Sequence, residues 1–129
     1  MNNFSKITLA VVTSASLMTL AAPAHAKGDD DVERRGSCTG ASDWKVKVGP
    51  EDGGLEVEAE VDSNRVGQTW RWQLVHNGTA SATRTAVTTA PSGSFEVRRV
   101  VANLGGPDTF TFRATNASSG ERCVGRVSF

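Results

Sequence analysis

The chain has 129 residues, with 14 lysines and arginines and 14 aspartates and glutamates, so its formal net charge is zero. A neutral chain has no overall field that attracts nucleic acid or an acidic membrane, which argues against both as partners. With only two cysteines and two histidines, a metal centre built from several such ligands is also disfavoured. We find no phosphate-binding glycine loop and expect no cofactor.

Residues 1–26 have the pattern of a secretory signal peptide. Lys6 supplies the positive start, residues 7–22 are apolar or small and uncharged, and Ala24-His25-Ala26 forms an Ala-x-Ala cleavage pattern. The apolar run of about 16 residues is shorter than the roughly 20 that a membrane span needs, although an uncleaved anchor helix is the alternative. We therefore expect cleavage before Lys27 and a secreted, extracellular chain without a membrane anchor.

The two cysteines, Cys38 and Cys123, both follow the expected cleavage site. In an exported protein, an even number of cysteines indicates a disulfide. This bond would join the start of the fold to its last strand and close a long loop, which is worth roughly 4–5 kcal/mol in the chain-entropy model. No ligand cluster accompanies the pair, and this argues against a metal site or a reactive thiol.

The segment 27–37 is nearly all charge and glycine. Such a composition buries too little apolar surface to offset the entropy of ordering, so we expect a disordered leader there. The aspartates at 29–31 lack the glycine turn and distal glutamate of a calcium-binding loop. The remaining residues, 38–129, are expected to form one domain.

Two segments, 43–48 and 55–62, alternate between apolar and charged residues, the pattern of a strand with one buried face. The inward positions are Trp44, Val46, Val48, Leu55, Val57, Ala59 and Val61. The outward positions are Lys45, Lys47, Glu56, Glu58, Glu60 and Asp62. The glycine- and proline-rich residues 49–54 predict the turn between the two strands.

The stretch 68–88 predicts a β-hairpin. Its first arm alternates, and the expected inward residues are Trp70, Trp72 and Leu74, with Arg71, Gln73 and Val75 outward. Asn77-Gly78 favours a type I′ turn, in which both central residues need positive φ. The second arm is rich in threonine, a β-branched residue that suits strands.

Three further strands are expected at 94–101, 109–115 and 122–129. Their inward residues are Phe95, Val97, Phe110, Phe112, Ala114, Cys123, Val127 and Phe129. Arg99 breaks the alternation, so we expect a bulge or a twist there. Seven short strands with turn signals every eight to twelve residues, and no helical period, predict an all-β, seven-stranded antiparallel sandwich.

This strand count and spacing, with an inward Trp70 or Trp72 on the third strand, resembles immunoglobulin-like and fibronectin-type-III-like domains over residues 38–129. Two features depart from that pattern. The expected Cys38–Cys123 bond joins the first segment to the seventh strand, and there is no tyrosine for the tyrosine corner. The composition and export signal are also similar to those of small secreted proteins of high-GC Gram-positive bacteria. This resemblance is architectural and assigns no functional residues.

We find no catalytic constellation and expect no enzyme activity. His76 precedes the Asn77-Gly78 turn, where a polar residue is ordinary, and no G-x-S-x-G elbow is present. Neighbouring outward glutamates of 55–62 are about 6.5–7 Å apart, a separation found in some glycosidases. A solvated sheet face explains them better.

The outward arginines offer a binding hypothesis. If the sheets pair as in immunoglobulin-like folds, the strands at 68–76, 109–115 and 122–129 share one sheet, with Arg71, Arg113 and Arg126 outward and few acids. That face would be locally basic and would meet an anionic polymer or a protein, although scattered solubilising arginines are the alternative. On the other sheet, opposite charges would pair across strands.

The sequence therefore predicts a secreted, monomeric, non-catalytic binding module whose partner is a protein or a cell-envelope polymer. The alternatives are a small-molecule or carbohydrate carrier with a Trp/Phe-lined surface, and a secreted enzyme inhibitor using loop 63–67 or 103–108. We expect Trp44, Trp70 and Trp72 to lie in the core, with an exposed platform for sugar rings as the alternative.

Overall fold

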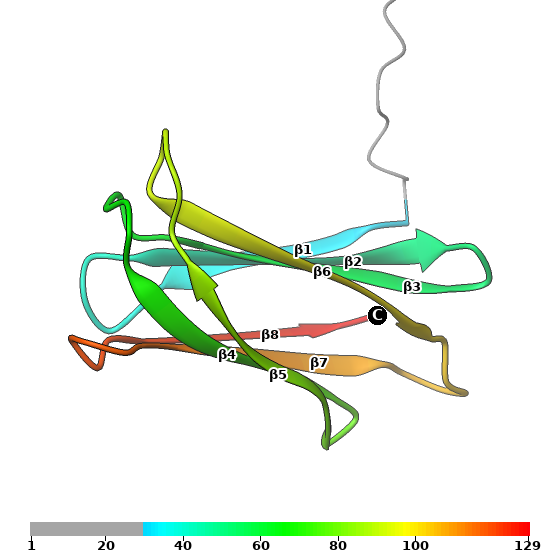
Figure 1. The fold of residues 1–129 in the computed structure, drawn as a ribbon. Coiled ribbons are helices and arrows are strands. Elements are labelled where there is room, and N and C mark those ends of the chain that lie inside the picture. The colour runs from blue at the N-terminus through cyan, green and yellow to red at the C-terminus, as the bar shows by residue number, and fades with distance from the viewer. Residues whose placement is uncertain (1–29) are drawn as a thin grey trace, which may run out of the picture.

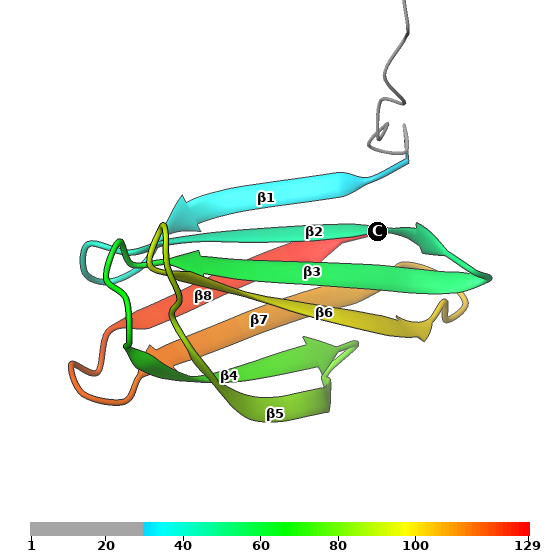
Figure 2. The same ribbon diagram turned by 45° about the horizontal axis from the view of Figure 1, so that its top comes forward.

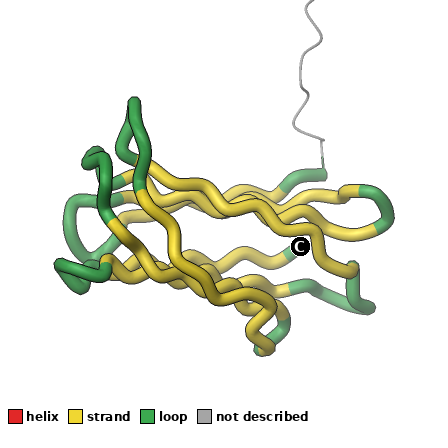
Figure 3. Tube along the Cα trace, viewed as in Figure 1, coloured by secondary structure: helices red, strands yellow, loops and turns green. Residues whose placement is uncertain are grey.

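The computed structural model describes residues 30–129, which contain eight strands and no helix (Figures 1 and 3). The strands are β1 (Val32–Ser37), β2 (Asp43–Glu51), β3 (Gly54–Asp62), β4 (Thr69–His76), β5 (Thr79–Val87), β6 (Ser94–Ala102), β7 (Thr109–Asn116) and β8 (Arg122–Ser128). The expected signal peptide, residues 1–26, and the start of the expected leader lie outside the described residues. Within 30–129, no helix is long and apolar enough to cross a membrane.

The strands form two antiparallel sheets that lie as two layers (Figure 2). Sheet A has the order β1-β2-β3-β6, and sheet B has the order β5-β4-β7-β8. The expected grouping of strands is confirmed. The strands predicted at 43–48, 55–62 and 94–101 share sheet A, and those predicted at 68–76, 109–115 and 122–129 share sheet B. The all-β prediction is confirmed as well.

The predicted number of seven strands is wrong, because β1 adds an eighth. It lies in the segment that we expected to be a disordered leader, and it pairs with β2 along its full length, from Val32↔Val48 to Ser37↔Asp43. The charged side chains of β1 obscured its alternation in the sequence. A strand at a sheet edge needs only backbone partners and a few inward side-chain contacts. Val32 supplies one of these side-chain contacts by packing against the core.

Two local expectations have different outcomes. The type I′ turn is supported, since Asn77 and Gly78 have φ values of 47° and 82°. The bulge at Arg99 is absent, because β3 and β6 pair without a register shift from Gly54↔Ala102 to Asp62↔Ser94. A shift does occur in the hairpin, between Leu74 and Val75.

The core lies between the two sheets and is built from residues that alternation placed inward, but Trp44, Val97 and Phe129, which were also placed inward, are only partly buried against it. Trp70 is 0% exposed and Trp72 is 5% exposed. The Trp70 ring lies 6.2 Å from the Phe95 ring of sheet A, and the Trp72 ring lies 6.3 Å from that of Phe112. The other buried apolar residues are Val46, Val48, Leu55, Val57, Ala59, Val61, Leu74, Phe110, Ala114, Cys123 and Val127.

Two glycines make room for Trp44 at one edge of the molecule. A Cβ atom on Gly36 of β1 would lie 2.6 Å from Cζ2 of the indole, and one on Gly125 of β8 would lie 2.6 Å from Cε3. The half-buried ring therefore lies between a strand of sheet A and a strand of sheet B. Any side chain at either glycine would displace it.

The predicted disulfide is confirmed. Cys38 in the β1–β2 loop is bonded to Cys123 in β8, with a Cα–Cα distance of 4.3 Å, and the two cysteines are 85 positions apart in sequence. Backbone contacts support the same junction, since the N–H of Thr39 donates to the carbonyl of Arg122 at 2.8 Å. The N–H of Arg122 in turn donates to Oγ1 of Thr39 at 2.9 Å.

Candidate functional site

The outer face of sheet B brings together four exposed arginines, which we call the arginine face: Arg71, Arg113, Arg122 and Arg126. Strand pairing fixes their positions in three rows. Arg71 of β4 pairs with Thr115 of β7, which pairs with Arg122 of β8. The second row is Gln73, Arg113 and Val124, and the third is Val75, Thr111 and Arg126.

The three arginines predicted from the sequence are thus on one face, and the structure adds Arg122. Arg122 begins β8, and alternation from Arg126 back through Val124 reaches it. The sequence therefore contained the signal. It was missed because a strand end is the position where a pattern of period two has the fewest neighbours to support it.

None of the four arginines forms a recorded ion pair with another residue of the described part of the chain. The basic residues with a carboxylate partner are Arg35, Lys45, Lys47, His76 and Arg98. The three rows contain no acid, and β5 extends the first two with Thr85 opposite Arg71 and Thr83 opposite Gln73. The face is therefore positive and hydroxyl-rich, and its guanidinium groups are available to a ligand.

The outer face of sheet A has the opposite character, because its charges pair with one another. Glu58 accepts from Lys47 Nζ at 3.1 Å and from Arg98 Nη2 at 2.7 Å, while Lys45 Nζ lies 3.7 Å from Glu60. The expected pairing of opposite charges across these strands is confirmed. Most of the cations on this face are therefore paired with carboxylates, and acids outnumber bases there, so it does not attract anions as the arginine face can.

The pKa of Glu58 reflects this pairing. Burial raises the pKa of its carboxyl, but hydrogen bonds from Lys47 and Glu56 and the positive charges of Lys47 and Arg98 outweigh burial, so the pKa is below its usual value. The hydrogen bond to Glu58 is also the main reason why the pKa of Lys47 is raised, against the opposing effect of burial. The ionised forms of both groups are therefore favoured by folding.

Glu58→Gln is expected to lower the free energy of unfolding at pH 7 by about 1–2 kcal/mol, since it removes a mostly buried charge-assisted contact while Arg98 remains largely solvated. A carboxyl whose folded pKa is depressed stabilises above its unfolded pKa, near 4.5, and this contribution is lost as the pH falls through the folded value. Urea unfolding at pH 7 and at pH 3 should therefore show a difference between variant and wild type only at pH 7.

The more exposed Glu96→Gln is the matched control for this experiment, and it should change stability little at either pH. A Glu58→Gln difference of equal size at pH 7 and pH 3 would contradict the assignment to charge.

The two tryptophans named as candidate binding residues do not reach the surface. Trp70 and Trp72 are buried in the core, as described above, and within the described residues Nε1 of Trp70 has no hydrogen-bond partner. A stacking platform needs exposed ring faces, and these two rings present none. Their contribution is to the packing of the two sheets.

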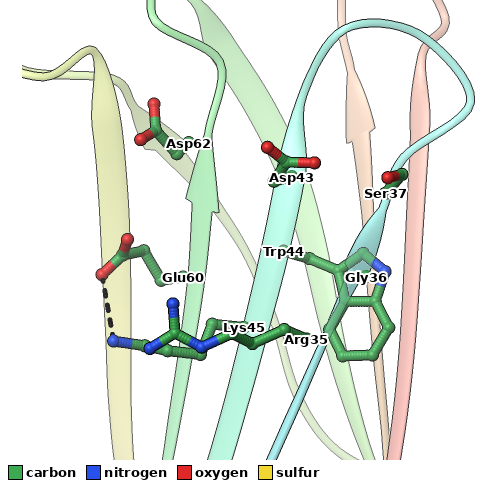
Figure 4. A pocket seen from close by; sticks show the side chains of 8 residues that line it. All are labelled: Arg35, Gly36, Ser37, Asp43, Trp44, Lys45, Glu60 and Asp62. Carbon is green, nitrogen blue, oxygen red and sulfur yellow. Dashed lines mark ion pairs between the residues drawn. The ribbon is translucent and has the colours of Figure 1, made fainter.

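Trp44 borders a hollow of about 410 Å³ (Figure 4). The hollow lies over β1, β2 and β3, and Figure 4 shows the Lys45–Glu60 ion pair at its side. Its lining residues are Arg35, Gly36, Ser37, Asp43, Trp44, Lys45, Glu60 and Asp62. The lining is mostly charged, with one aromatic ring, and so differs from the Trp/Phe-lined surface that a carrier of apolar molecules would need.

His76 has a partner that the sequence did not reveal. Its Nε2 lies 2.6 Å from Oδ1 of Asp108, and its ring stacks on Phe110 with centroids 4.3 Å apart. Asp108 is 1% exposed, and its Oδ1 also accepts from the N–H of Leu104. No recorded hydrogen bond joins His76 to a hydroxyl or thiol in residues 30–129. The pair therefore joins the end of β4 to the β6–β7 loop.

The described residues contain no group of three or more His, Cys, Asp or Glu placed to hold a metal ion. No protein-family model, curated protein or solved structure matches the chain. The arginine face is therefore the candidate site on which a function is best argued.

Proposed function

We propose that this protein is a secreted, non-catalytic binding module with an immunoglobulin-like β-sandwich fold, and that it binds an anionic polymer through the arginine face. Two four-stranded antiparallel sheets with a shared core support the fold. The Cys38–Cys123 disulfide supports an oxidising compartment, in agreement with the signal-peptide pattern of residues 1–26.

The observation on which this function rests is the set of four exposed arginines on one sheet face that has no carboxylate among its paired rows. Guanidinium presents its donors in a planar fork that binds carboxylate, sulfate or phosphate through two hydrogen bonds. Arginines that served only solubility would have no reason to cluster away from acids. With a near-zero net charge, attraction arises from this face and not from the whole molecule.

The neighbours of the arginines favour a polysaccharide over a protein partner. Thr83, Thr85, Thr111 and Thr115 share the face with Gln73, so hydroxyl and amide groups surround each charge. These groups can exchange hydrogen bonds with sugar hydroxyls. Beside Arg71 and Thr115 there is also a hollow of about 330 Å³ towards the β7–β8 turn, where a ring could rest.

The triple variant Arg71→Ser/Arg113→Ser/Arg126→Ser is expected to lose salt-sensitive retention on a dextran sulfate resin. Three exposed charge contacts of up to about 1 kcal/mol each correspond to a loss of affinity of up to about 150-fold. The variant should elute at a lower salt concentration than wild type, because salt screens exposed charge contacts and fewer of them remain in the variant.

The matched control is Arg34→Ser/Arg65→Ser/Arg84→Ser, which removes the same charge from exposed positions outside the arginine face. It should elute close to wild type. If both triple variants lose retention equally, binding follows net charge alone, and the proposed site is wrong.

A further inference from the structure

Three of the four arginines lie on one diagonal across sheet B. From Arg71 on β4, a step of one strand across and two residues along reaches Arg113 on β7, since Gln73 pairs with Arg113. The same step from Arg113 reaches Arg126 on β8, because Arg113 pairs with Val124. Arg122 is off this line, in the row of Arg71.

The two steps are equal in length. Neighbouring strands are about 4.8 Å apart and two residues along a strand span about 6.8 Å, so each diagonal step is about 8 Å between Cα atoms. The three arginines thus form a straight series with a total span of about 17 Å. A linear ligand can contact all three only if it runs obliquely to the strands.

The threonines on β7 complete this pattern. Thr115 is paired with Arg71, and Thr111 is paired with Arg126, one on each side of Arg113 along the strand. Each interval between two arginines on the diagonal is therefore bordered by a hydroxyl group. A ligand whose charged units alternate with uncharged, hydroxyl-bearing units matches this order.

We infer that the arginine face binds a linear acidic polysaccharide along the Arg71–Arg113–Arg126 diagonal, with one anionic group in each two-sugar repeat. This inference rests on the proposed function and specifies its ligand class. Successive anionic groups contact successive arginines, and the neutral sugars between them lie against Thr111 and Thr115. A polymer with much denser charge, such as polyphosphate, has no uncharged units to place against the threonines between the arginines.

The first test uses labelled hyaluronan oligosaccharides, which have one carboxylate per two-sugar repeat, in fluorescence polarisation with the wild-type protein. Affinity should rise about five-fold with each repeat, up to three repeats, and then level off. Polyphosphate and single-stranded DNA with the same number of charges should bind more weakly. Equal affinity for either of these polymers would overturn the inference.

The second test compares two arginines of the same face. Arg113→Ser interrupts the diagonal and should reduce affinity for the three-repeat oligosaccharide about five-fold. Arg122→Ser removes the same charge off the diagonal and should reduce it by a smaller factor. Equal losses would mean that the face attracts anions without reading their spacing.

The two proposals fail in different ways. If dextran sulfate retains wild type through the arginine face but the oligosaccharides show no dependence on spacing, the proposed function stands and the diagonal inference is wrong. If neither dextran sulfate nor hyaluronan binds, both are wrong.

Discussion

The double variant Cys38→Ala/Cys123→Ala is expected to unfold at a much lower urea concentration than the oxidised wild type. The bond closes a loop of 85 positions, and opening it restores chain entropy to the unfolded state worth roughly 4–5 kcal/mol. Small domains are stable by only about 5–15 kcal/mol, so this loss is about a third or more of the total. Equilibrium urea unfolding followed by tryptophan fluorescence measures the change.

Wild type reduced with dithiothreitol is the control, because it lacks the bond and keeps both side chains. It should unfold at nearly the same midpoint as the double variant. If the double variant is as stable as the oxidised wild type, the bond does not stabilise the fold by restricting the unfolded chain, and this prediction is wrong.

Asp108→Ala is the second substitution with a large expected effect, a loss of about 3 kcal/mol in the free energy of unfolding. The side chains of Asp108 and His76 are 1% and 10% exposed, and they meet at 2.6 Å. Without the carboxylate, the imidazole Nε2 has no partner while it stays buried, and the N–H of Leu104 loses its acceptor. Urea unfolding at pH 7 would measure the loss.

Asp43→Ala is a suitable control for that experiment, since Asp43 is an exposed aspartate at the start of a strand. It should change stability by less than about 0.5 kcal/mol. Asp108→Asn keeps one acceptor oxygen and should lie between the alanine variant and wild type. If Asp108→Ala is as mild as Asp43→Ala, the buried contact does not stabilise the fold.

Much of the fold could be predicted from alternation alone. Leu55 to Asp62 is a clear case, because every second residue is apolar and the structure buries all of these, with Glu58 as the one charged residue of the strand that is buried too. Strand β1 shows the limit. Its sequence VERRGS has a single large apolar residue, Val32. The strand is held in place by backbone pairing to β2, and backbone pairing leaves no periodic pattern in the side chains.

The candidate site was predictable only in part, for the same reason. Period two places Arg71, Arg113 and Arg126 outward, so their common face followed once the sheets were grouped. Their alignment on a diagonal depends on the register between strands, and register is decided by contacts between distant segments. The contact of His76 with Asp108 was hidden because its two residues are 32 positions apart and one lies in a loop.

The position of the disulfide has a mechanical consequence. The start of β1 and the end of β8 lie at the same end of the molecule (Figure 1), and tension applied to the two flanks of the domain would pass along β1 to Cys38, across the bond to Cys123, and back along β8. The segment between the cysteines, which are 85 positions apart, would bear no load while the bond is intact. If the domain unfolded under tension, the intact bond would keep this segment out of the extended chain, and its reduction would allow about 300 Å more extension.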